Sequence, residues 1–364
     1  MRVLHVEGGR NLYGGALQVR YLLEGLAARG VDNLLACPSG SELAAAARPF
    51  ARVYAMPMGG DLDLALIWRL KRLIEDRRPD LVHLHSRIGA DVLGGIAARL
   101  CAVPAVHSRR QDNPEARWMV RLKYRLHRRV IAISQGIGQV LLSEGLPASK
   151  LACVRSAVDA AVFDRPCDPD WFRREFELPE GARAIAVVAQ LIERKGHGYL
   201  LEALPELIAQ FAGLRVLFFG KGPLEARLRR QILARGLDGR VVLAGFRHDL
   251  PRILPCLELL VHPAVREGLG VSLLQAASAA VPIVACDAGG MPEAVRDRVN
   301  GLLVPPADVG ALRQAIRTLL ADGAMARRMG QAGRELMRRE FSIDVMVDGN
   351  LRIYQQVLQE AAVG

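Results

Sequence analysis

The chain has 364 residues, of which 51% are hydrophobic and 24% are charged. This composition is ordinary for a globular protein, and at about 100–200 residues per domain the length predicts two domains. The sequence contains no internal repeat, no low-complexity segment and no uncharged apolar stretch of about 18 residues, the length that spans a bilayer. It therefore argues against a disordered chain, a repeat protein and a membrane-spanning protein.

The six cysteines are spread along the chain, and no two of them form a C-x-x-C pair. This spacing argues against a zinc or thioredoxin-type site. We expect small buried thiols in a reducing compartment. The first residues lack the apolar segment of a signal peptide, so a cytoplasmic protein is expected. The cysteines are Cys37, Cys101, Cys153, Cys167, Cys256 and Cys286.

Short apolar runs alternate with longer stretches of helical periodicity through the first half of the chain. Helical spacing covers 16–28 and ends at Gly30, and helical stretches also separate the later apolar runs. This alternation is typical of β-α-β units, which form a parallel sheet with helices on both faces. The predicted strands lie at 3–6, 34–37, 81–84, 105–107 and 130–133.

The same alternation starts again after a polar, proline-containing segment at 164–170, which has the composition of a linker. We predict two Rossmann-like α/β domains, 1–165 and 166–340, each built on a doubly wound parallel sheet. The last stretch, 341–364, is expected to be a helix that packs back on the first domain. Strands of the second domain are predicted at 184–189, 216–219, 241–244, 259–262 and 283–285.

The clearest motif follows the predicted strand 259–262 and contains Glu267, Gly268 and Gly270. A glycine-containing turn there leads into a helix and presents the backbone amides of residues 268–271, which favour a phosphate. Phosphate would repel the Glu267 carboxylate, so sugar hydroxyls are its natural partner. A turn that only starts a helix, with a solvated glutamate, would give the same local sequence.

Other turns of the second domain lie at the carboxyl edge of the same sheet, where open α/β sheets bind ligands. Lys195 follows the first strand of the domain and is a suitable point charge for a diphosphate. Gly220 to Pro223 follow the next strand, and Gly289-Gly290 follow the strand 283–285. Several glycine turns on one edge favour a binding site over simple packing.

These residues carry a resemblance to the retaining glycosyltransferases of family 4, which adopt the GT-B fold. The family signature E-G-x-G-x(4)-E, G-x-P-V-V-A and G-G-x-x-E is similar to segments 267–275, 280–285 and 289–293. The family's G-R-L-x-x-x-K-G and G-x-G-P resemble 189–196 and 220–223. The resemblance covers nearly all of residues 1–345 and implies two Rossmann-like domains that face each other across a cleft.

The resemblance also implies roles for individual residues. Glu267 would hold hydroxyls of the transferred sugar and His107 would contact that sugar near its reacting carbon, so these two are the predicted catalytic residues. Lys195 and the turn amides would bind the diphosphate without a metal ion. The predicted donor-binding residues are Gly15, Gln190, Lys195, Gly220, Phe246, Arg247, Gly268, Leu269, Gly270, Val271 and Gln275.

Two positions depart from the family pattern. Gln275 stands where the family has the glutamate that meets the ribose hydroxyls, and an amide can still donate to one hydroxyl and accept from another. Gln190 stands where the family has an arginine beside the lysine, which removes a positive charge next to the leaving diphosphate. These departures keep open a pseudoenzyme that binds nucleotide-sugars with little or no activity.

Histidines and aspartates of the first domain suggest metal ligands only weakly. His83 and His85 resemble the family's H-x-H segment, and strand alternation points them the same way, but we see no third ligand nearby. We expect one to be packed and one to face the cleft. Asp61 and Asp63 form a D-x-D pair at the start of a helical stretch, where helix capping explains them better than a metal.

Most of the excess positive charge lies in the first domain, because residues 1–165 hold 24 basic and 15 acidic side chains while 166–364 hold 25 and 23. Within 109–129 a predicted helix has a basic stripe beside an apolar stripe that includes Trp118. This pattern suits an anionic membrane surface or a phosphorylated lipid acceptor, although a helix packed on its sheet would share it. The basic stripe comprises Arg117, Arg121, Arg125 and Arg128.

Together these features predict a metal-independent hexosyltransferase that retains anomeric configuration, uses a nucleotide-sugar and needs no cofactor. UDP is favoured over GDP in the donor. The expected acceptor is a glycan or lipid-linked molecule of lipopolysaccharide or cell-envelope synthesis, met by a cytoplasmic enzyme peripheral to the inner face of the plasma membrane. A nucleotide-sugar epimerase is the alternative enzyme, but Glu267 has no evident acid–base partner. Aromatic residues make up only 5% of the chain, which argues against nucleic-acid binding.

Overall fold

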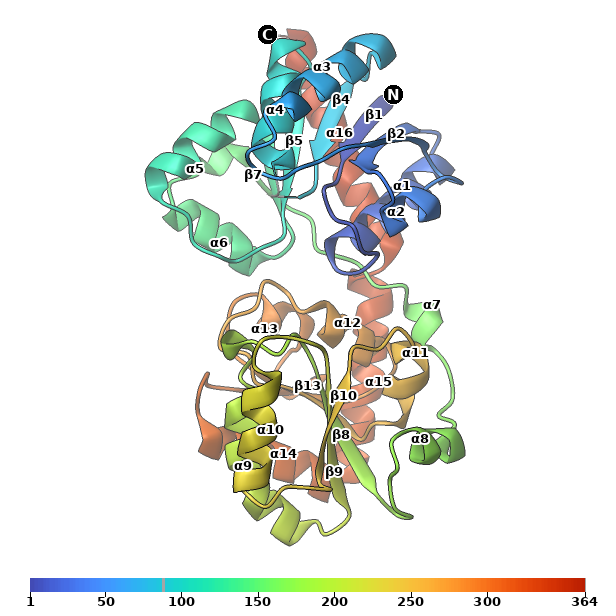
Figure 1. Ribbon diagram of the computed structural model, residues 1–364, viewed down its shortest axis with the longest axis vertical. Helices are drawn as coiled ribbons and strands as arrows, with labels where there is room; N and C mark the ends of the chain where they lie inside the picture. The colour runs from blue at the N-terminus through green and yellow to red at the C-terminus, as the bar shows by residue number, and fades with distance from the viewer. Residues whose placement is uncertain (87–88, 364) are drawn as a thin grey trace. The chain divides into compact units, whose positions relative to one another are not determined.

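The computed structural model describes residues 1–86 and 89–363 and divides into two compact units. Unit 1 consists of Met1–Ala157 and Ile343–Gly364, and unit 2 of Val158–Ser342. The division lies eight residues before the predicted boundary at 165, because the short helix α7 (Ala160–Phe163) packs on helices of unit 2. Figure 1 shows both units.

Unit 1 is built on a seven-stranded parallel sheet with the strand order β3-β2-β1-β4-β5-β6-β7. The predicted strands are present, and two further strands, β3 and β7, extend the sheet at its two edges. The strands are β1 (Arg2–Val6), β2 (Asp32–Pro38), β3 (Arg52–Met56), β4 (Leu81–Leu84), β5 (Ala105–Arg109), β6 (Arg129–Ala132) and β7 (Leu151–Cys153).

Helices cover both faces of this sheet, as a doubly wound fold requires (Figure 1). Leucines and alanines of α3 and α4 pack on one face, and α1, α2 and α16 pack on the other. The helices are α1 (Gly15–Ala28), α2 (Glu42–Ala46), α3 (Ala65–Arg77), α4 (Ala90–Leu100), α5 (Arg117–Lys123), α6 (Gln135–Ser143) and α16 (Ile343–Val363), with short 3₁₀ turns η1 (Tyr124–Leu126) and η2 (Ala148–Lys150).

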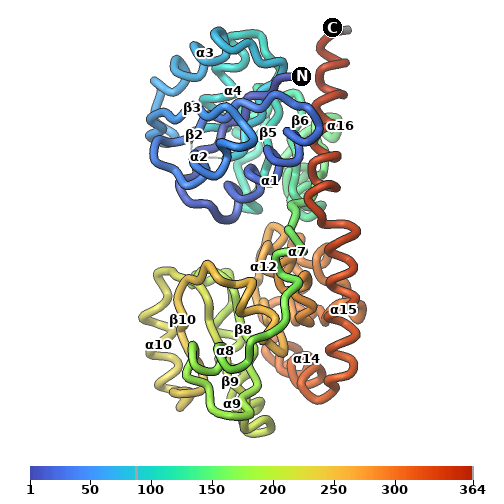
Figure 2. Tube along the Cα trace, turned by 90° about the vertical axis from the view of Figure 1, so that its right-hand side faces the viewer, coloured from blue at the N-terminus to red at the C-terminus, as the bar shows by residue number. Residues whose placement is uncertain are grey.

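The last helix, α16, belongs to unit 1 and lies along α1 (Figure 2). The two helices approach closely at Gly25, where an added Cβ would come within 2.5 Å of Val347. Arg29 at the end of α1 pairs with Asp344 at 2.9 Å and Asp348 at 2.7 Å. The hydroxyl of Tyr354 lies 2.5 Å from Nδ1 of His83, so α16 also reaches the centre of the sheet.

Unit 2 has a six-stranded parallel sheet with the order β10-β9-β8-β11-β12-β13. Its strands are β8 (Arg183–Val188), β9 (Leu214–Phe219), β10 (Val241–Gly245), β11 (Leu259–His262), β12 (Ile283–Cys286) and the unpredicted β13 (Gly301–Val304). Contacts pair α9 with α14 and α12 with α15. The helices are α8 (Pro169–Glu175), α9 (His197–Gln210), α10 (Glu225–Ala234), α11 (Leu250–Ile253), α12 (Val271–Ser278), α13 (Met291–Ala294), α14 (Val309–Ala321) and α15 (Gly323–Glu340), with 3₁₀ turns η3 (Glu193–Lys195) and η4 (Leu254–Cys256).

The cysteines differ from the sequence prediction. Cys167, before α8, and Cys256, in η4, form a disulfide with Cα atoms 4.8 Å apart, so the expectation of free thiols is wrong for these two. The two cysteines are 89 residues apart in the sequence, so no local sequence motif indicated that they pair. The other four cysteines are free thiols. Among the described helices, none combines the length and apolarity needed to cross a bilayer.

Candidate functional site

Two predicted site residues of unit 2 meet at the topological switch point of its sheet, between β8 and β11. Strands β8 and β11 are neighbours, but the chain continues from them toward opposite edges of the sheet, which is where open α/β sheets bind ligands. Lys195 lies in the loop after β8 and Glu267 in the loop after β11. Lys195 Nζ forms an ion pair with a carboxylate oxygen of Glu267, and the two side chains are only 10% and 14% exposed. A cation and a carboxylate are therefore combined in one sheltered position.

His262, the last residue of β11, is a further member of this site that the sequence analysis did not single out. It is fully buried, and its Nε2 lies 3.1 Å from the Glu267 carboxylate. Burial alone would raise the pKa of Glu267, but the contacts with His262 and Lys195 outweigh it and hold that pKa well below its ordinary value. Glu267 is therefore a fixed anion that the protein orients from two sides.

Glycines let the loops around this pair approach each other closely. Gly196 has φ +70°, and a Cβ added there would lie 1.9 Å from the carbonyl oxygen of Pro263. Gly289 has φ +58°, and a Cβ added there would lie 2.1 Å from the carbonyl oxygen of Glu267. Only glycine fits these two positions. The Gly290 amide also donates to the Glu267 carbonyl oxygen at 3.0 Å. The glycine turns therefore fix the backbone of Glu267.

The start of α12 supplies backbone donors next to Glu267. Gly270 is the N-cap residue and has no side chain to satisfy the first amides of the eight-residue helix. The Gly268 amide is different, because it donates to Oε1 of Glu267 at 3.0 Å. In this structure the Gly268 amide therefore stabilises the carboxylate.

The other predicted donor-binding residues lie around the same edge of the sheet. Gln190 is exposed, Gln275 is half-buried on α12, and Leu269 is buried. Gly220 is the first residue after β9, and its backbone has φ +146°. Phe246 is 39% exposed and meets His248 edge to face.

Arg247 is held by the N-terminal part of unit 2. Its guanidinium pairs with Asp249 at 2.6 Å and Glu175 at 2.5 Å, and it lies over the ring of Phe176. Arg247 also lines a pocket of about 430 Å³ between α8 and β10. Its side chain is therefore committed to two carboxylates, and the part of it that a nucleobase could contact is limited.

Gly15 begins α1 in unit 1, and it has polar neighbours that the sequence analysis missed. An added Cβ on Gly15 would lie 3.3 Å from the side chain of Arg110. Arg110 interacts electrostatically with Glu7, whose pKa is raised by burial and whose Oε2 has no hydrogen-bond partner within the described part of the chain. Glu7 and Arg110 directly follow β1 and β5. That position at the carboxyl edge was the signal available in the sequence.

His107 is located away from solvent. It is 1% exposed, it packs near the rings of Tyr124 and His127, and neither of its ring nitrogens has a hydrogen-bond partner among the residues that the structure describes. Burial lowers its pKa well below the ordinary value, so the ring is neutral. In this arrangement His107 supports the core beneath α5, and contact with a sugar would require that core to rearrange.

The H-x-H segment has a third histidine beside it, contrary to the sequence analysis. His5, His83 and His85 are all buried, and their potential ligand atoms lie within 4.8 Å of one another. His5 Nδ1 is 3.0 Å from His85 Nε2, and the two nitrogens of His83 meet Tyr354 and Ser108. The prediction that one histidine faces a cleft is therefore wrong. Neutral imidazoles are metal ligands, but His83 already uses both nitrogens.

The D-x-D pair does not cap the helix that follows it, because the N-cap residue of α3 is Leu64 and the described residues give that helix no side-chain cap, so the capping expectation is wrong. The Asp61 carboxylate accepts from the Gly89 amide at 2.6 Å, and that of Asp63 accepts from the Gly59 amide at 2.8 Å and pairs with Arg69. Both aspartates therefore fix loops around the start of α3.

The basic segment forms a shorter helix than the sequence suggested. Helix α5 ends at Lys123, and Arg128 lies beyond it, just before β6, so the four arginines do not form one helical stripe. Trp118 and Leu122 are 69% and 60% exposed, which excludes a helix whose apolar side is fully packed on the sheet. The exposed arginines of this segment are Arg117, Arg121, Arg125 and Arg128.

Comparison with protein families matches both halves of the chain. Residues 13–162 match the model described as Glycosyltransferase Family 4, and residues 170–336 match the model described as Glycosyl transferases group 1. A GDP-mannose-dependent alpha-(1-6)-phosphatidylinositol monomannoside mannosyltransferase of Mycolicibacterium smegmatis is 30% identical over 73% of this chain and 74% of its own. The 2-deoxystreptamine glucosyltransferase of Streptomyces kanamyceticus is 28% identical over 76% of this chain and 77% of its own.

Solved structures share the GT-B arrangement of two Rossmann-like domains. A glycosyltransferase from Rickettsia africae superposes with a TM-score of 0.87 at 18% identity and covers 98% of each chain. HepE of Anabaena, solved in complex with UDP-glucose, has a TM-score of 0.81 at 20% identity and covers 100% of each chain. The predicted fold class is therefore confirmed.

Proposed function

Because the chain belongs to the glycosyltransferases of family 4 and group 1, we propose that it moves a hexose from a nucleoside-diphosphate sugar to a glycan or lipid-linked acceptor with retention of configuration. The observation that carries this proposal is the sheltered Lys195–Glu267 pair beside the uncapped start of α12. Lys195 and the α12 amides would bind the diphosphate, and Glu267 would bind sugar hydroxyls. UDP is the favoured nucleotide, and HepE, a relative in fold, binds UDP-glucose.

The chemistry would proceed on one face of the sugar. The bond from the anomeric carbon to the diphosphate oxygen breaks while the acceptor oxygen forms a bond on the same side. The proton of the acceptor hydroxyl passes to the leaving diphosphate, whose charge Lys195 and the α12 amides stabilise. We therefore expect transfer to continue in the presence of EDTA.

The acceptor side of the proposal rests on unit 1. Its exposed arginines and the exposed Trp118 on α5 suit an anionic, lipid-linked or lipopolysaccharide-type acceptor at a membrane surface. One relative, 27% identical over 50% of this chain, is the lipopolysaccharide core biosynthesis glycosyltransferase LpsE of Rhizobium meliloti.

Thermal stabilisation by nucleotides tests the donor proposal directly. A ligand at about 100 times its dissociation constant adds roughly 2.7 kcal/mol to stability. We expect UDP or a UDP-sugar to raise the melting temperature, and Lys195→Ala to abolish the rise. Stabilisation by GDP alone would reassign the base, and no stabilisation by any nucleotide would contradict the donor site.

Product analysis then tests the reaction. Retention at the anomeric carbon of a glycosidic product supports the proposal, whereas inversion would overturn the mechanism. Conversion of the nucleotide-sugar into its epimer without an acceptor product would support the alternative enzyme. If the protein binds UDP but neither hydrolyses the nucleotide-sugar nor transfers its sugar, then Gln190 and Gln275 have reduced it to a binding role.

A further inference from the structure

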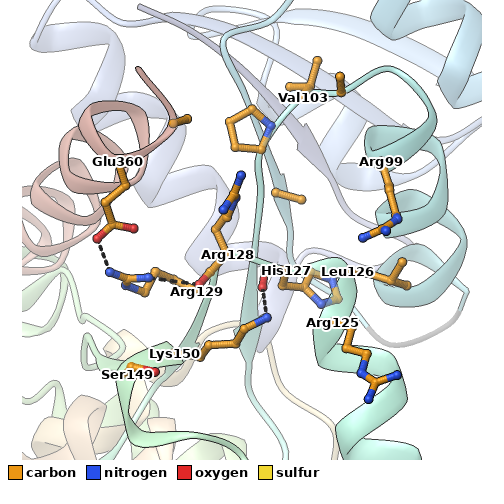
Figure 3. Close-up of a pocket in the computed structure, with 14 residues that line it drawn as sticks. Arg99, Val103, Arg125, Leu126, His127, Arg128, Arg129, Ser149, Lys150 and Glu360 are labelled. Atoms are coloured by element: carbon orange, nitrogen blue, oxygen red, sulfur yellow. Dashed lines mark hydrogen bonds and ion pairs between the residues drawn. The ribbon is translucent and has the colours of Figure 1, made fainter. Parts of the chain in front are cut away.

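A cationic pocket lies in unit 1 at the edge where the strands of the sheet begin (Figure 3). Its volume is about 640 Å³. Arg99 comes from the end of α4, Arg128 directly precedes β6, Arg129 begins that strand, and Lys150 directly precedes β7. Substrates of open α/β sheets bind at the opposite edge, where strands end, so this pocket is separate from the Gly15 side of unit 1.

The charge balance of the pocket is strongly positive. Its lining includes the basic side chains of Arg99, Arg125, Arg128, Arg129 and Lys150, against a single carboxylate, that of Glu360. Glu360 forms an ion pair with Arg129, as Figure 3 shows. Lys150 donates to the backbone carbonyls of Tyr124 and His127, at 2.7 Å each. Burial and the like charges of Arg128 and Arg129 lower the pKa of Lys150.

Three arginines of this pocket are free to meet a ligand. The guanidinium groups of Arg99, Arg125 and Arg128 are on exposed side chains and form no hydrogen bond or ion pair with any residue that the structure describes. Cations held together without carboxylates repel one another, and an anion that binds several of them relieves that repulsion. Guanidinium groups bind phosphate oxygens through paired hydrogen bonds, so phosphate is the chemical group that suits them.

Exposed apolar side chains lie next to the pocket. A second hollow, lined by Arg117, Trp118, Arg121, Leu122 and Arg125, shares Arg125 with it. Trp118 and Leu122 are 69% and 60% exposed there, and Leu100, which follows Arg99, is 54% exposed. Exposed apolar side chains beside a phosphate site suit a lipid, which presents phosphate and acyl chains together.

We infer that the pocket of Arg99, Arg125, Arg128, Arg129 and Lys150 binds the phosphate of an anionic membrane lipid, with Trp118 and Leu122 entering the bilayer interface beside it. This inference rests on one part of the proposed function, namely that the enzyme reaches its acceptor at a membrane. It adds a defined headgroup site, on the opposite edge of the sheet from the transfer chemistry, to a general attraction between a basic domain and an anionic surface.

Vesicle binding by the full-length protein tests the site. We expect binding to vesicles of phosphatidylcholine mixed with phosphatidylglycerol and little binding to phosphatidylcholine alone. The double variant Arg99→Gln/Arg128→Gln should bind the mixed vesicles roughly 30-fold more weakly, since each cation near an anionic surface contributes about 1 kcal/mol. The matched control, Arg48→Gln/Arg72→Gln, removes two exposed arginines of unit 1 outside the pocket. It should lose much less.

Glu360→Gln gives a test in the opposite direction. It removes the pocket's carboxylate and frees Arg129, so binding to mixed vesicles should become tighter. An equal loss in both double variants, or no effect of Glu360→Gln, would overturn a defined site. Competition by inorganic phosphate or UDP at concentrations that leave vesicle charge unscreened would reassign the pocket to a soluble anion. Stabilisation of the wild type by UDP is measured separately, so a failed donor proposal and a failed lipid site are distinguishable.

Discussion

The Lys195 ammonium and the Glu267 carboxylate form an ion pair between the loops that follow β8 and β11. Each is the group best suited to one half of a nucleotide-sugar. A diphosphate that binds Lys195 must compete with Glu267, and a sugar whose hydroxyls bind Glu267 releases Lys195. Under the proposed function, the pair would therefore link occupation of the phosphate position to occupation of the sugar position.

Glu267→Gln tests this link. The amide keeps the shape of the side chain but loses the charge that holds Lys195. We expect transfer to fall roughly 10- to 100-fold, the usual effect of removing a hydrogen bond to a charged group. Affinity for UDP without sugar should stay the same or increase. Steady-state kinetics and calorimetric titration with UDP measure the two effects.

The matched control for that variant is Glu193→Gln. Glu193 lies in the same unit and forms an exposed ion pair with Arg227. The control's transfer rate and its affinity for UDP should both remain near those of the wild type. If Glu267→Gln loses UDP affinity as strongly as activity, then Glu267 serves to hold the loop and not the sugar.

Buried histidines of unit 1 should make the protein sensitive to acid. Burial lowers the pKa of His5 and of His127 from 6.5 to about 3. The unfolded chain therefore takes up protons below pH 6.5 that the folded chain refuses until about pH 3, so stability is present above pH 6.5 and is lost as pH falls. Each histidine contributes up to about 1.4 kcal/mol per pH unit.

Denaturant unfolding at pH 7.5 and pH 5 measures this loss. His127→Gln removes one of the groups that bind a proton only in the unfolded chain. The variant's free energy of unfolding should therefore change less between the two pH values than that of the wild type, whatever its absolute stability. A free energy of unfolding that stays constant between the two pH values would show that these rings are not held neutral.

The ion pair of Arg109 and Glu115 should contribute strongly to the stability of unit 1. The two side chains are 1% and 7% exposed, and the atoms lie 2.6 Å apart. Glu115→Gln leaves a buried guanidinium without a carboxylate partner, which costs roughly 3–5 kcal/mol. Chemical denaturation measures the change.

A surface pair provides the comparison for that variant. Glu75 pairs with Lys71 on the outside of α3, and Glu75→Gln should change stability little, because exposed ion pairs are weakened by water and salt. Equal effects of the two substitutions would show that the Arg109–Glu115 pair is open to water in solution.

The Cys167–Cys256 disulfide predicts a redox-dependent stability of unit 2. It closes a loop of 89 residues, and closing a loop of this size stabilises a protein by up to about 4–5 kcal/mol in the chain-entropy model. Thiol titration of the unfolded, unreduced protein should detect four thiols, the number of free cysteines. Six thiols would contradict the bond. A reductant should lower the melting temperature, and Cys167→Ser should do the same without it.

The central strands of both sheets could be predicted because they are buried on both faces and appear as continuous apolar runs. The strands that were missed lie at edges. Only three residues form β7, and β3 begins at the exposed Arg52 and has no fully buried residue, so neither has a strong apolar signal. The edge strand β13 begins at a glycine, which is depleted in strands.

The candidate site was predictable where its residues share a loop, and not where they meet through the fold. Glu267 and the glycines around it stand together in the sequence. The approach of Arg110 to Gly15 and the meeting of His5 with His85 each need the paired strands to be in place. The buried location of His107 also depends on Tyr124 and His127, which follow α5 in the chain.

The return of α16 to unit 1 has a consequence for the order in which the protein is made. A ribosome completes Val158–Ser342 before it adds the helix that covers Leu22 and contacts His83 through Tyr354. Unit 2 can therefore fold while unit 1 still has an uncovered apolar face. The first domain to be synthesised is the last to be completed, and during that interval its uncovered apolar face is prone to aggregation.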